Sequence, residues 1–252
     1  MVKHDQQADS QASYWAVVPA AGIGKRMNSA VPKQYLKLNG REVLAWTLQS
    51  LQALDRLQGI VLVLHPHDEY YKQNLAAHFP QVRAVRGGDE RIHSVLAGLE
   101  ALDEQVDGRD WVLVHDAVRP CLRISDLQKL LKGLVDSETG GILASPVKDT
   151  LKKANTQGQI TQTLNRDEYW LAATPQMFRY QLLRTALQQA LEAGVLVTDE
   201  AAAMERLGYP VSVVSGRADN IKITSAEDLS LAEFILAKQV SAGTAAVSQE
   251  ID

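Results

Sequence analysis

Short apolar runs alternate along the chain with longer stretches in which apolar residues recur every three or four positions. The runs predict short buried strands, at Tyr14 to Pro19, Ile60 to Leu64, Val82 to Val85, Trp111 to Val114, Gly141 to Pro146 and Val211 to Val214. The longer stretches predict helices, at Glu42 to Leu54, Ile92 to Leu102, Ser125 to Val135, Arg179 to Ala193 and Ala226 to Ala237. This alternation is typical of an α/β fold, with a mostly parallel sheet flanked by helices on both faces.

One segment, Val147 to Arg166, interrupts this alternation. It is too polar for a core helix. Its centre, Asn155 to Gly158, is a turn signal, and apolar and polar residues alternate on both sides of it. The pattern predicts an exposed β-hairpin arm over about 147–168. An isolated two-stranded ribbon is marginally stable in water, so we expect the arm to pack against another surface, such as a second subunit.

The two ends of the chain, residues 1–13 and 239–252, are polar, small and aperiodic, which predicts flexible tails around a single domain at 14–238. Of the 252 residues, 46% are hydrophobic, enough for a sizeable core. The first residues lack the apolar centre of a signal peptide. No apolar run approaches the roughly 20 residues that a membrane span needs. We therefore expect a cytoplasmic protein that does not enter a membrane.

Charge and cysteine content restrict the kinds of partner and site. The net charge of −4 gives no overall attraction for nucleic acid or anionic membranes, so a bound polyanion needs a local cluster of cations. A single cysteine forms no internal disulfide and no cysteine-cluster metal site. The six histidines are not spaced as a ligand set, so no protein-only metal site is expected.

The first strand leads into the small-residue loop Ala20-Ala21-Gly22-Ile23-Gly24. Small residues allow backbone N–H groups to approach a phosphate closely. The loop fits neither the dinucleotide fingerprint nor the Walker motif, and a simple tight turn stays a possible interpretation. Arg26, and Lys33 beside the rigid Pro32, supply converging cations, which favours a triphosphate site.

Further polar clusters follow other strands. His115-Asp116-Ala-Val-Arg119 comes after a strand, where open α/β sheets bind ligands, although an aspartate that caps a turn beside an arginine is an equal alternative. Gly87-Gly88-Asp89-Glu90-Arg91 opens a helix that contains Ser94, and for Glu90 and Arg91 a purely structural role is favoured. Thr198-Asp199-Glu200 resembles a helix N-cap with an acidic first turn. Lys222 lies between two isoleucines in a predicted short strand and needs an anionic partner.

Taken in order, these motifs resemble the 2-C-methyl-D-erythritol 4-phosphate cytidylyltransferases of the non-mevalonate isoprenoid pathway. The resemblance covers residues 14–238 and rests on an ordered set of motifs, namely Pro19 to Met27, Pro32 to Tyr35, Gly88 to Arg91, His115 to Pro120, Thr174 to Gln176, Thr198 to Glu200 and Asp219 to Thr224. It implies a Rossmann-like sheet, CTP as the nucleotide, a polyol phosphate as the acceptor, Mg²⁺ as the cofactor, and a homodimer whose arm reaches the neighbouring active site.

For the nucleotide, the resemblance assigns triphosphate contacts to the backbone N–H groups of Ala20, Ala21 and Gly22. The residues that match stabilisers of charge at the reacting phosphorus are Arg26 and Lys33. Those that match cytosine and ribose contacts are Gly88, Asp89 and Ser94.

For the acceptor, the resemblance assigns contacts to Asp116, Arg119 and Thr198. Thr150 and Arg166, on the arm, match residues that grip the acceptor phosphate, and Lys222 matches a positioning lysine. The mechanism needs no dedicated base, because a phosphate monoester with a second pKa of about 6 is already mostly a dianion at neutral pH. Catalysis should come from fixed positive charge and alignment.

Other functions stay open at this point. The nearest is a ribitol 5-phosphate cytidylyltransferase, which shares many of these motifs. A catalytically silent CTP-binding regulator is a second, although the joint presence of Arg26, Lys33 and Lys222 disfavours it. A nucleotide-sugar glycosyltransferase would need an Asp-x-Asp metal site after a strand, and Asp116-Ala-Val does not supply one.

Overall fold

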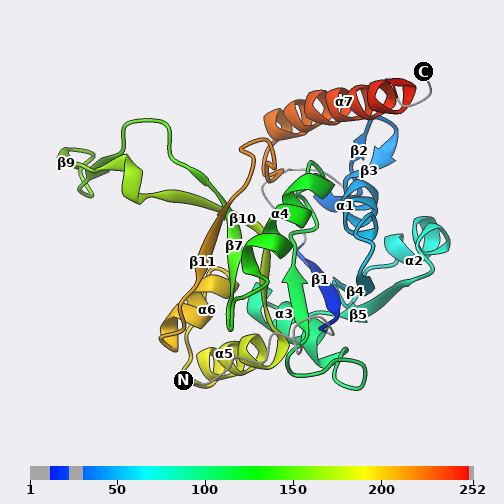
Figure 1. Cartoon of the computed structure of the whole chain (residues 1–252), viewed down its shortest axis with the longest axis horizontal. Coiled ribbons are helices and arrows are strands. Elements are labelled where there is room, and N and C mark those ends of the chain that lie inside the picture. The colour runs from blue at the N-terminus through cyan, green and yellow to red at the C-terminus, as the bar shows by residue number, and fades with distance from the viewer. Residues whose placement is uncertain (1–11, 23–30, 250–252) are drawn as a thin grey trace.

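The computed structural model describes residues 12–22 and 31–249 (Figure 1). The strands of its main sheet are β1 (Tyr14–Ala20), β4 (Leu57–Leu64), β5 (Val82–Arg86), β6 (Trp111–Val114), β7 (Gly140–Pro146), β10 (Trp170–Arg179) and β11 (Ser212–Ser215). The α-helices are α1 (Val43–Gln52), α2 (Tyr70–Asn74), α3 (Arg91–Glu100), α4 (Ile124–Leu134), α5 (Tyr180–Glu192), α6 (Glu200–Arg206) and α7 (Ala226–Gln249). Every strand and helix predicted from the apolar pattern is present, with bounds shifted by a few residues except at the end of α7.

The main sheet has the order β11-β7-β10-β6-β1-β4-β5 within the described residues. β1, β4, β5 and β6 pair in parallel, and so do β7 and β11. β10 lies between β6 and β7 and runs antiparallel to both. The sequence pattern did not predict β10, because Thr174, Pro175 and Gln176 interrupt its apolar run. The fold is therefore the predicted mostly parallel α/β sheet, with one antiparallel strand in its interior.

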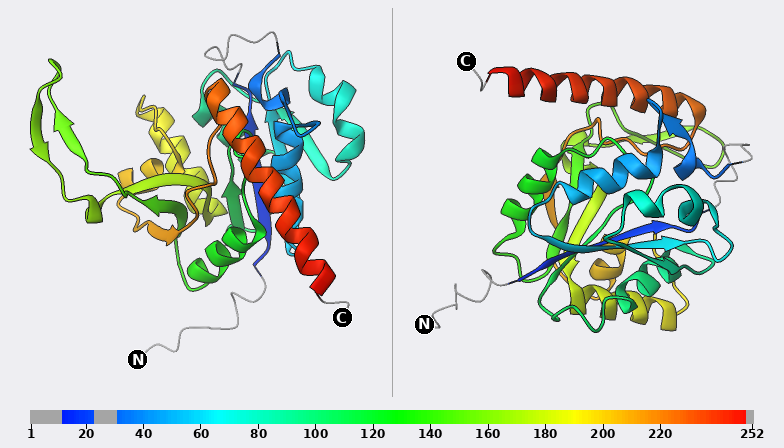
Figure 2. Two further views of the ribbon diagram at one scale, coloured as in Figure 1. Left: turned by 90° about the horizontal axis from the view of Figure 1, so that it is seen from above. Right: turned by 90° about the vertical axis from the view of Figure 1, so that its right-hand side faces the viewer.

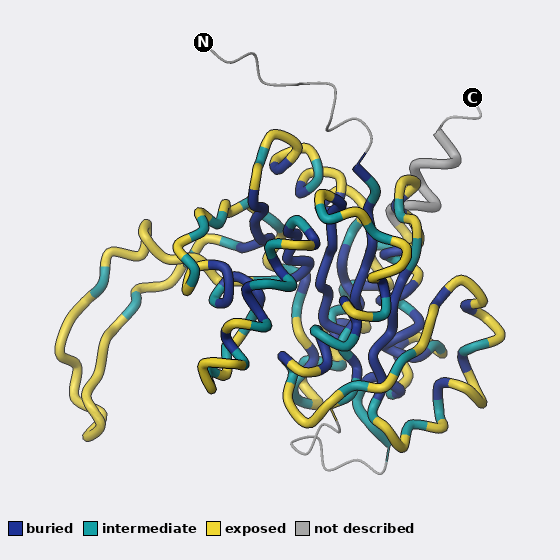
Figure 3. Tube along the Cα trace, turned by 90° about the horizontal axis from the view of Figure 1, so that it is seen from below, coloured by how far each residue is buried: buried dark blue, intermediate teal, exposed yellow. Residues whose placement is uncertain are grey.

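Alternate residues of the strands point to opposite faces of the sheet. In β1, Ala16 and Val18 pack with leucines of α1 and α4 on one face. Val17 packs on the other face with Val95 and Leu99 of α3 and with apolar residues of α5 and α6. Gly98 of α3 lies so close to Val17 that a Cβ there would come 2.5 Å from its Cγ1. The result is three layers with the sheet in the middle, whose buried strands are dark blue in Figure 3.

α7 crosses the top of the molecule in Figure 1 and forms a small core of its own with the β2–β3 hairpin (Lys37–Leu38 and Arg41–Glu42). Ala232 and Leu236 are buried there. The helix continues to Gln249, beyond its predicted end at Ala237, so it takes in part of the segment predicted as a flexible tail. No helix in residues 12–22 and 31–249 is long and apolar enough to cross a membrane.

The predicted hairpin is present as β8 (Lys152–Ala154) and β9 (Ile160–Thr163), which pair antiparallel. Its turn uses Gly158 with a φ of +80°, a conformation that glycine adopts without strain. Figures 1 and 2 show the hairpin extending away from the three-layered body. Nearly all of its residues are exposed, as the yellow tube in Figure 3 shows.

Candidate active site

The polar motifs meet at one edge of the sheet, where the parallel strands have their carboxyl ends. The loops after β1, β5 and β6 begin there with Ala21, Gly87 and His115. β10 passes the same edge, because Gln176 pairs with Val114, the last residue of β6. The segment 216–225 returns from β11 to this edge, since the backbone N–H of Ile223 donates to the carbonyl of Val118 over 2.9 Å. Ligands of open α/β sheets bind at this position.

Asp116 is buried in the turn after β6, and cations from three segments surround its carboxylate. Lys222 Nζ lies 2.9 Å from Oδ2, and Arg119 Nε lies 3.5 Å from the same oxygen. Arg91 Nη2 lies 3.4 Å from Oδ1. Burial alone would raise the pKa of Asp116, but Arg91, Lys222 and Arg119 hold it well below its usual range. At neutral pH the site therefore contains an ionised carboxylate surrounded by positive charge.

The segment that carries Lys222 is held by hydrogen bonds between side chains and backbone carbonyls. The side-chain amide of Asn220 donates to the carbonyl of Thr174 over 2.8 Å. Arg119 Nη1 donates to the carbonyl of Asn220 over 2.7 Å. The prediction of a short strand around Lys222 is wrong, because residues 221–224 form no ladder. The anion that the lysine was expected to need is Asp116, which is 106 positions earlier in the chain and could not be identified from local sequence.

His115 connects this turn to β10. The backbone N–H of Asp116 donates to Thr174 Oγ1 over 3.1 Å, which leaves the Thr174 hydroxyl proton to donate to His115 Nδ1 at 2.9 Å. The other ring nitrogen, Nε2, lies 3.2 Å from the carbonyl of Arg119 and so acts as a donor. This pattern assigns a neutral imidazole protonated at Nε2. Burial lowers the pKa of His115 to about 4, in agreement with the neutral form.

The buried His115 should make stability depend on pH. Its pKa is about 4 in the folded chain and 6.5 as the unperturbed value, so protonation favours the unfolded state as the pH falls from 6.5 towards 4. Between pH 7.5 and 5.0 this linkage removes about 2 kcal/mol of unfolding free energy. Urea unfolding at the two pH values should show that the unfolding free energy of the wild-type chain falls by this much more than that of His115→Gln. His78→Gln, at an exposed histidine, should keep the wild-type loss. Equal losses in all three proteins would contradict the assignment.

Lys33 begins a short 3-10 helix (Lys33–Tyr35) directly after Pro32. Its Nζ donates to the carbonyl of Ile223 over 3.2 Å, next to Lys222. Gln34 Nε2 donates to the carbonyl of Ala20 over 3.0 Å, which holds this helix against the end of β1. The fold thus brings Lys33, Lys222 and the loop after β1 to the same place.

The loops after β1 and β5 are in close contact. A Cβ on Gly87 would lie 2.9 Å from Ala21 Cβ and 2.6 Å from Ser94 Oγ, so only glycine fits between the two loops. A Cβ on Gly88 would lie 2.6 Å from His93 Cβ. Ser94 is buried and donates to backbone carbonyls of the preceding turn, and Asp89, in the loop before α3, is exposed. Gly22 is also exposed. These loops leave exposed backbone at the edge of the site.

Four other residues were predicted for the site. Arg26 lies outside the described residues. Thr198 is exposed just before α6, next to Asp199, whose Oδ1 accepts from the N–H of Ala202 as predicted for an N-cap. Thr150 and Arg166 are on the exposed arm, where Arg166 Nη1 donates to the carbonyl of Lys148 over 2.6 Å. Within one chain, the fold does not bring these two residues into the Asp116 cluster.

Two charged residues of the site were missed. Arg91 was expected to be structural, yet it contacts Asp116. Glu200 was expected in an ordinary acidic first turn, yet it is fully buried and pairs with both terminal nitrogens of Arg91, at 2.5 and 2.9 Å. Burial raises the pKa of Glu200, and Arg91 opposes that rise. No local signal marks either residue, because 109 positions separate them.

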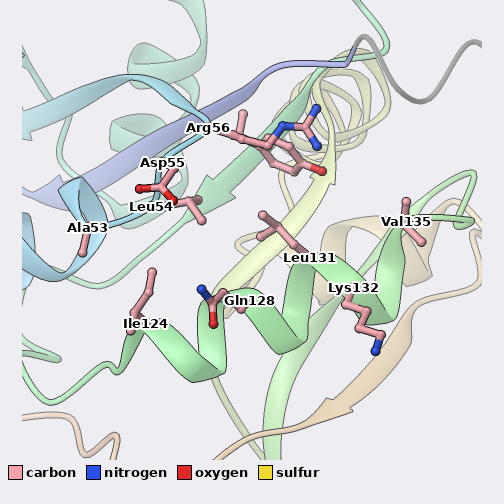
Figure 4. Close-up of a pocket in the computed structure, with 10 residues that line it drawn as sticks. Ala53, Leu54, Asp55, Arg56, Ile124, Gln128, Leu131, Lys132 and Val135 are labelled. Atoms are coloured by element: carbon pink, nitrogen blue, oxygen red, sulfur yellow. The ribbon is translucent and has the colours of Figure 1, made fainter. Parts of the chain in front are cut away.

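A hollow of about 390 Å³ lies at the opposite edge of the sheet (Figure 4). Its walls are the turn before β4 and one side of α4, with Leu54, Ile124 and Leu131 among its lining residues. Arg56 lies over the ring of Tyr14, 5.1 Å from its centroid. Tyr14 is the first residue of β1, whereas the Asp116 cluster follows the carboxyl end of β6, so the hollow is separate from the candidate active site. Among the described residues, no group of three or more histidines, cysteines or carboxylates could hold a metal ion.

Comparison with known proteins identifies similar sequences. The family model for 2-C-methyl-D-erythritol 4-phosphate cytidylyltransferase matches residues 14–238. The chain is 51% identical over 222 residues to the protein of that name from Shewanella oneidensis, covering 88% of this chain and 87% of the relative. It is 48% identical over 223 residues to the protein of that name from Vibrio atlanticus, covering 88% of this chain and 95% of the relative.

Solved structures agree with this similarity. The crystal structure of 2-C-methyl-D-erythritol 4-phosphate cytidylyltransferase from Francisella tularensis superimposes with a TM-score of 0.77 at 34% identity, over 89% of this chain and 100% of that one. The Thermus thermophilus enzyme gives a TM-score of 0.73 at 32% identity, over 88% and 98%. Both the sequence and the fold of this chain are therefore similar to the same group of proteins.

Proposed function

The chain belongs to the 2-C-methyl-D-erythritol 4-phosphate cytidylyltransferase family, and on that premise we propose that it transfers CMP from CTP to 2-C-methyl-D-erythritol 4-phosphate and releases pyrophosphate. The observation that carries the proposal is the convergence of Lys33, Lys222 and Arg119 at the carboxyl edge of the sheet. Fixed cations at this position suit a reaction between two anions.

The reaction needs little proton transfer. The acceptor phosphate is already mostly a dianion at neutral pH, because its second pKa is about 6. One of its oxygens attacks the α-phosphorus of CTP. The bond between the α-phosphorus and the bridging oxygen breaks, and pyrophosphate leaves with that oxygen. Negative charge grows on the α-phosphate, where Lys33, with Arg26 from the family resemblance, would stabilise it. Lys222 and Arg119 would contact the acceptor phosphate, and Asp116 would accept a hydrogen bond from a hydroxyl of the acceptor.

On the nucleotide side, the backbone N–H groups of Ala20, Ala21 and Gly22 would bind the triphosphate. The close contact between Gly87 and Ala21 supports this role, because it joins the phosphate loop to the loop that carries Gly88 and Asp89. Gly88, Asp89 and Ser94 would then contact cytosine and ribose. Thr198, exposed before α6, would contact the acceptor.

A pyrophosphate-release assay with each nucleoside triphosphate tests the function, using 2-C-methyl-D-erythritol 4-phosphate and ribitol 5-phosphate as separate acceptors. We expect release with CTP and the methylerythritol phosphate. Pyrophosphate release only with ribitol 5-phosphate would show that ribitol 5-phosphate is the acceptor. No release with any combination of nucleoside triphosphate and acceptor would contradict the enzyme activity.

The donor set at the site fits Mg²⁺ as a cofactor carried mainly by the nucleotide. Asp116 is the ionised carboxylate of the cluster, but Arg91, Arg119 and Lys222 already engage its oxygens. Mg²⁺ is usually held by substrate phosphates and waters in such sites, and Asp116 would supply at most one protein ligand. The ion would neutralise triphosphate charge.

Activity should therefore require Mg²⁺, although the nucleotide-free protein should bind it weakly. We expect EDTA to abolish pyrophosphate release and excess Mg²⁺ to restore it. Calorimetric titration of Mg²⁺ into the protein without CTP should give a dissociation constant in the millimolar range, because one carboxylate surrounded by cations is a poor site. Micromolar binding without CTP would reveal a ligand set that this proposal lacks.

The arm supports a homodimer in which each subunit completes its partner's site. Along the arm and its base, Ile160, Leu171 and Trp170 have exposed fractions of 65%, 60% and 42%, so the arm offers large apolar side chains to a second subunit. Thr150 and Arg166 are on the same arm and separate from the Asp116 cluster of their own chain. A two-fold dimer would bury the apolar residues and bring Thr150 and Arg166 to the partner's acceptor phosphate.

A further inference from the structure

Arg91 joins three segments of the site. It is the first residue of α3, directly after the loop that carries Gly88 and Asp89. Its two terminal nitrogens contact Glu200, at 2.5 and 2.9 Å, and one of them also lies 3.4 Å from Asp116 Oδ1. Glu200 is the first residue of α6, two positions after Thr198. One guanidinium therefore connects the nucleotide side, the Asp116 turn and the acceptor side.

The two oxygens of the Asp116 carboxylate contact different cations. Arg91 contacts Oδ1, whereas Lys222 and Arg119 contact Oδ2. Because Glu200 holds the guanidinium in a two-bond contact, Arg91 cannot turn to pair with Asp116 in the same way. Oδ2 therefore stays directed towards Lys222. Glu200 is fully buried, so its geometry is fixed by packing.

We propose that Arg91, held by Glu200, is a positioning residue that orients Asp116 and through it Lys222 for the acceptor phosphate. This inference rests on the proposed function and deepens it. Without Arg91, Asp116 Oδ1 loses its contact with a cation, and the carboxylate is free to rotate. Lys222 and Arg119, which both contact Oδ2, then lose their position relative to the acceptor phosphate. Misplacement of a reacting group by about 1 Å can cost about 10²-fold in rate. We expect kcat/KM for the acceptor to fall while the KM for CTP changes little.

Arg91→Gln alone is ambiguous, because it leaves Glu200 as a buried, unpaired carboxylate and should lower the melting temperature. The informative variant is Arg91→Gln with Glu200→Gln, which removes both charges and restores a neutral hydrogen-bonding pair. We expect a melting temperature near the wild-type value, a kcat/KM for 2-C-methyl-D-erythritol 4-phosphate reduced about 10- to 100-fold, and a KM for CTP within about threefold of wild type.

Arg91→Lys is a second, independent variant. It keeps a cation against Glu200, but a single ammonium cannot reproduce the two-bond contact while also reaching Asp116. We expect a stable protein with the same selective loss for the acceptor. The matched control is Arg184→Gln on α5, since Arg184 and Arg91 have equal side-chain exposure of 27% and Arg184 pairs with Asp103 over 2.7 Å. This control should keep wild-type kinetics.

Wild-type kcat/KM for the acceptor in a folded double variant, or in Arg91→Lys, would overturn the positioning role and leave the pair as a structural contact. A KM for CTP that rises as much as kcat/KM for the acceptor falls would also overturn it. These results are distinct from failure of the proposed function, which is measured on the wild-type chain as an absence of pyrophosphate release from CTP and 2-C-methyl-D-erythritol 4-phosphate.

Discussion

Replacing Lys33 with alanine should lower kcat about 10²- to 10³-fold, or roughly 3–4 kcal/mol in transition-state stabilisation, with a much smaller rise in the KM for CTP. Lys33 follows the rigid Pro32, and its Nζ is already directed to the carbonyl of Ile223, beside Lys222. A cation held in place before the reaction stabilises charge that grows on the α-phosphate without reorganisation. Steady-state kinetics with CTP and 2-C-methyl-D-erythritol 4-phosphate measure both constants.

The control for this variant is Lys37→Ala. Lys37 is a nearby lysine with a side chain 58% exposed, and it pairs with Glu42 on β3 rather than with the site. It should retain wild-type kcat, which would separate the loss of one site charge from a general change in net charge. If Lys33→Ala reduces kcat by only about tenfold or less, Lys33 does not stabilise the transition state.

Arg166 should act on the active site of the partner subunit. Arg166→Ala alone should be nearly inactive, as should Lys33→Ala, because each lacks a cation of the composite site. When the two inactive chains are unfolded and refolded together at equal amounts, about half of the dimers should be mixed if pairing is random. In a mixed dimer with arms acting in trans, one site has both Lys33 and Arg166 intact, and the other has both lesions.

Half of the dimers times half of their sites predicts about a quarter of wild-type activity. If the arm acts within its own chain, each site keeps one lesion and activity stays at the sum of the parents. Native mass spectrometry must confirm the mixed dimers, since only then does the absence of rescue exclude the trans arrangement. Lys153→Ala, at an exposed arm position, serves as the control and should be active without complementation.

Local sequence was sufficient for most of the fold. The strands and helices follow from short-range periodicity, which depends only on neighbouring residues, and the hairpin follows from a turn signal flanked by alternation. β10 was missed because Pro175 and its polar neighbours break the apolar run, although the strand is held by ladders with β6 and β7. The end of α7 was missed because small residues after Gln239 carry no clear period.

The sequence by itself determined which residue types were available to the site. Asp116, Arg119 and Lys33 stand in motifs close to strand ends, and Lys222 was conspicuous as a charge between two isoleucines. Only the tertiary structure decided which of them meet. It placed Lys222 on Asp116, and it paired Arg91 with a buried Glu200 that resembled an ordinary helix-start residue. Such pairs depend on strand order and on the return of the chain after β11, because contact energies act between neighbours in space that can be 100 or so positions apart in sequence.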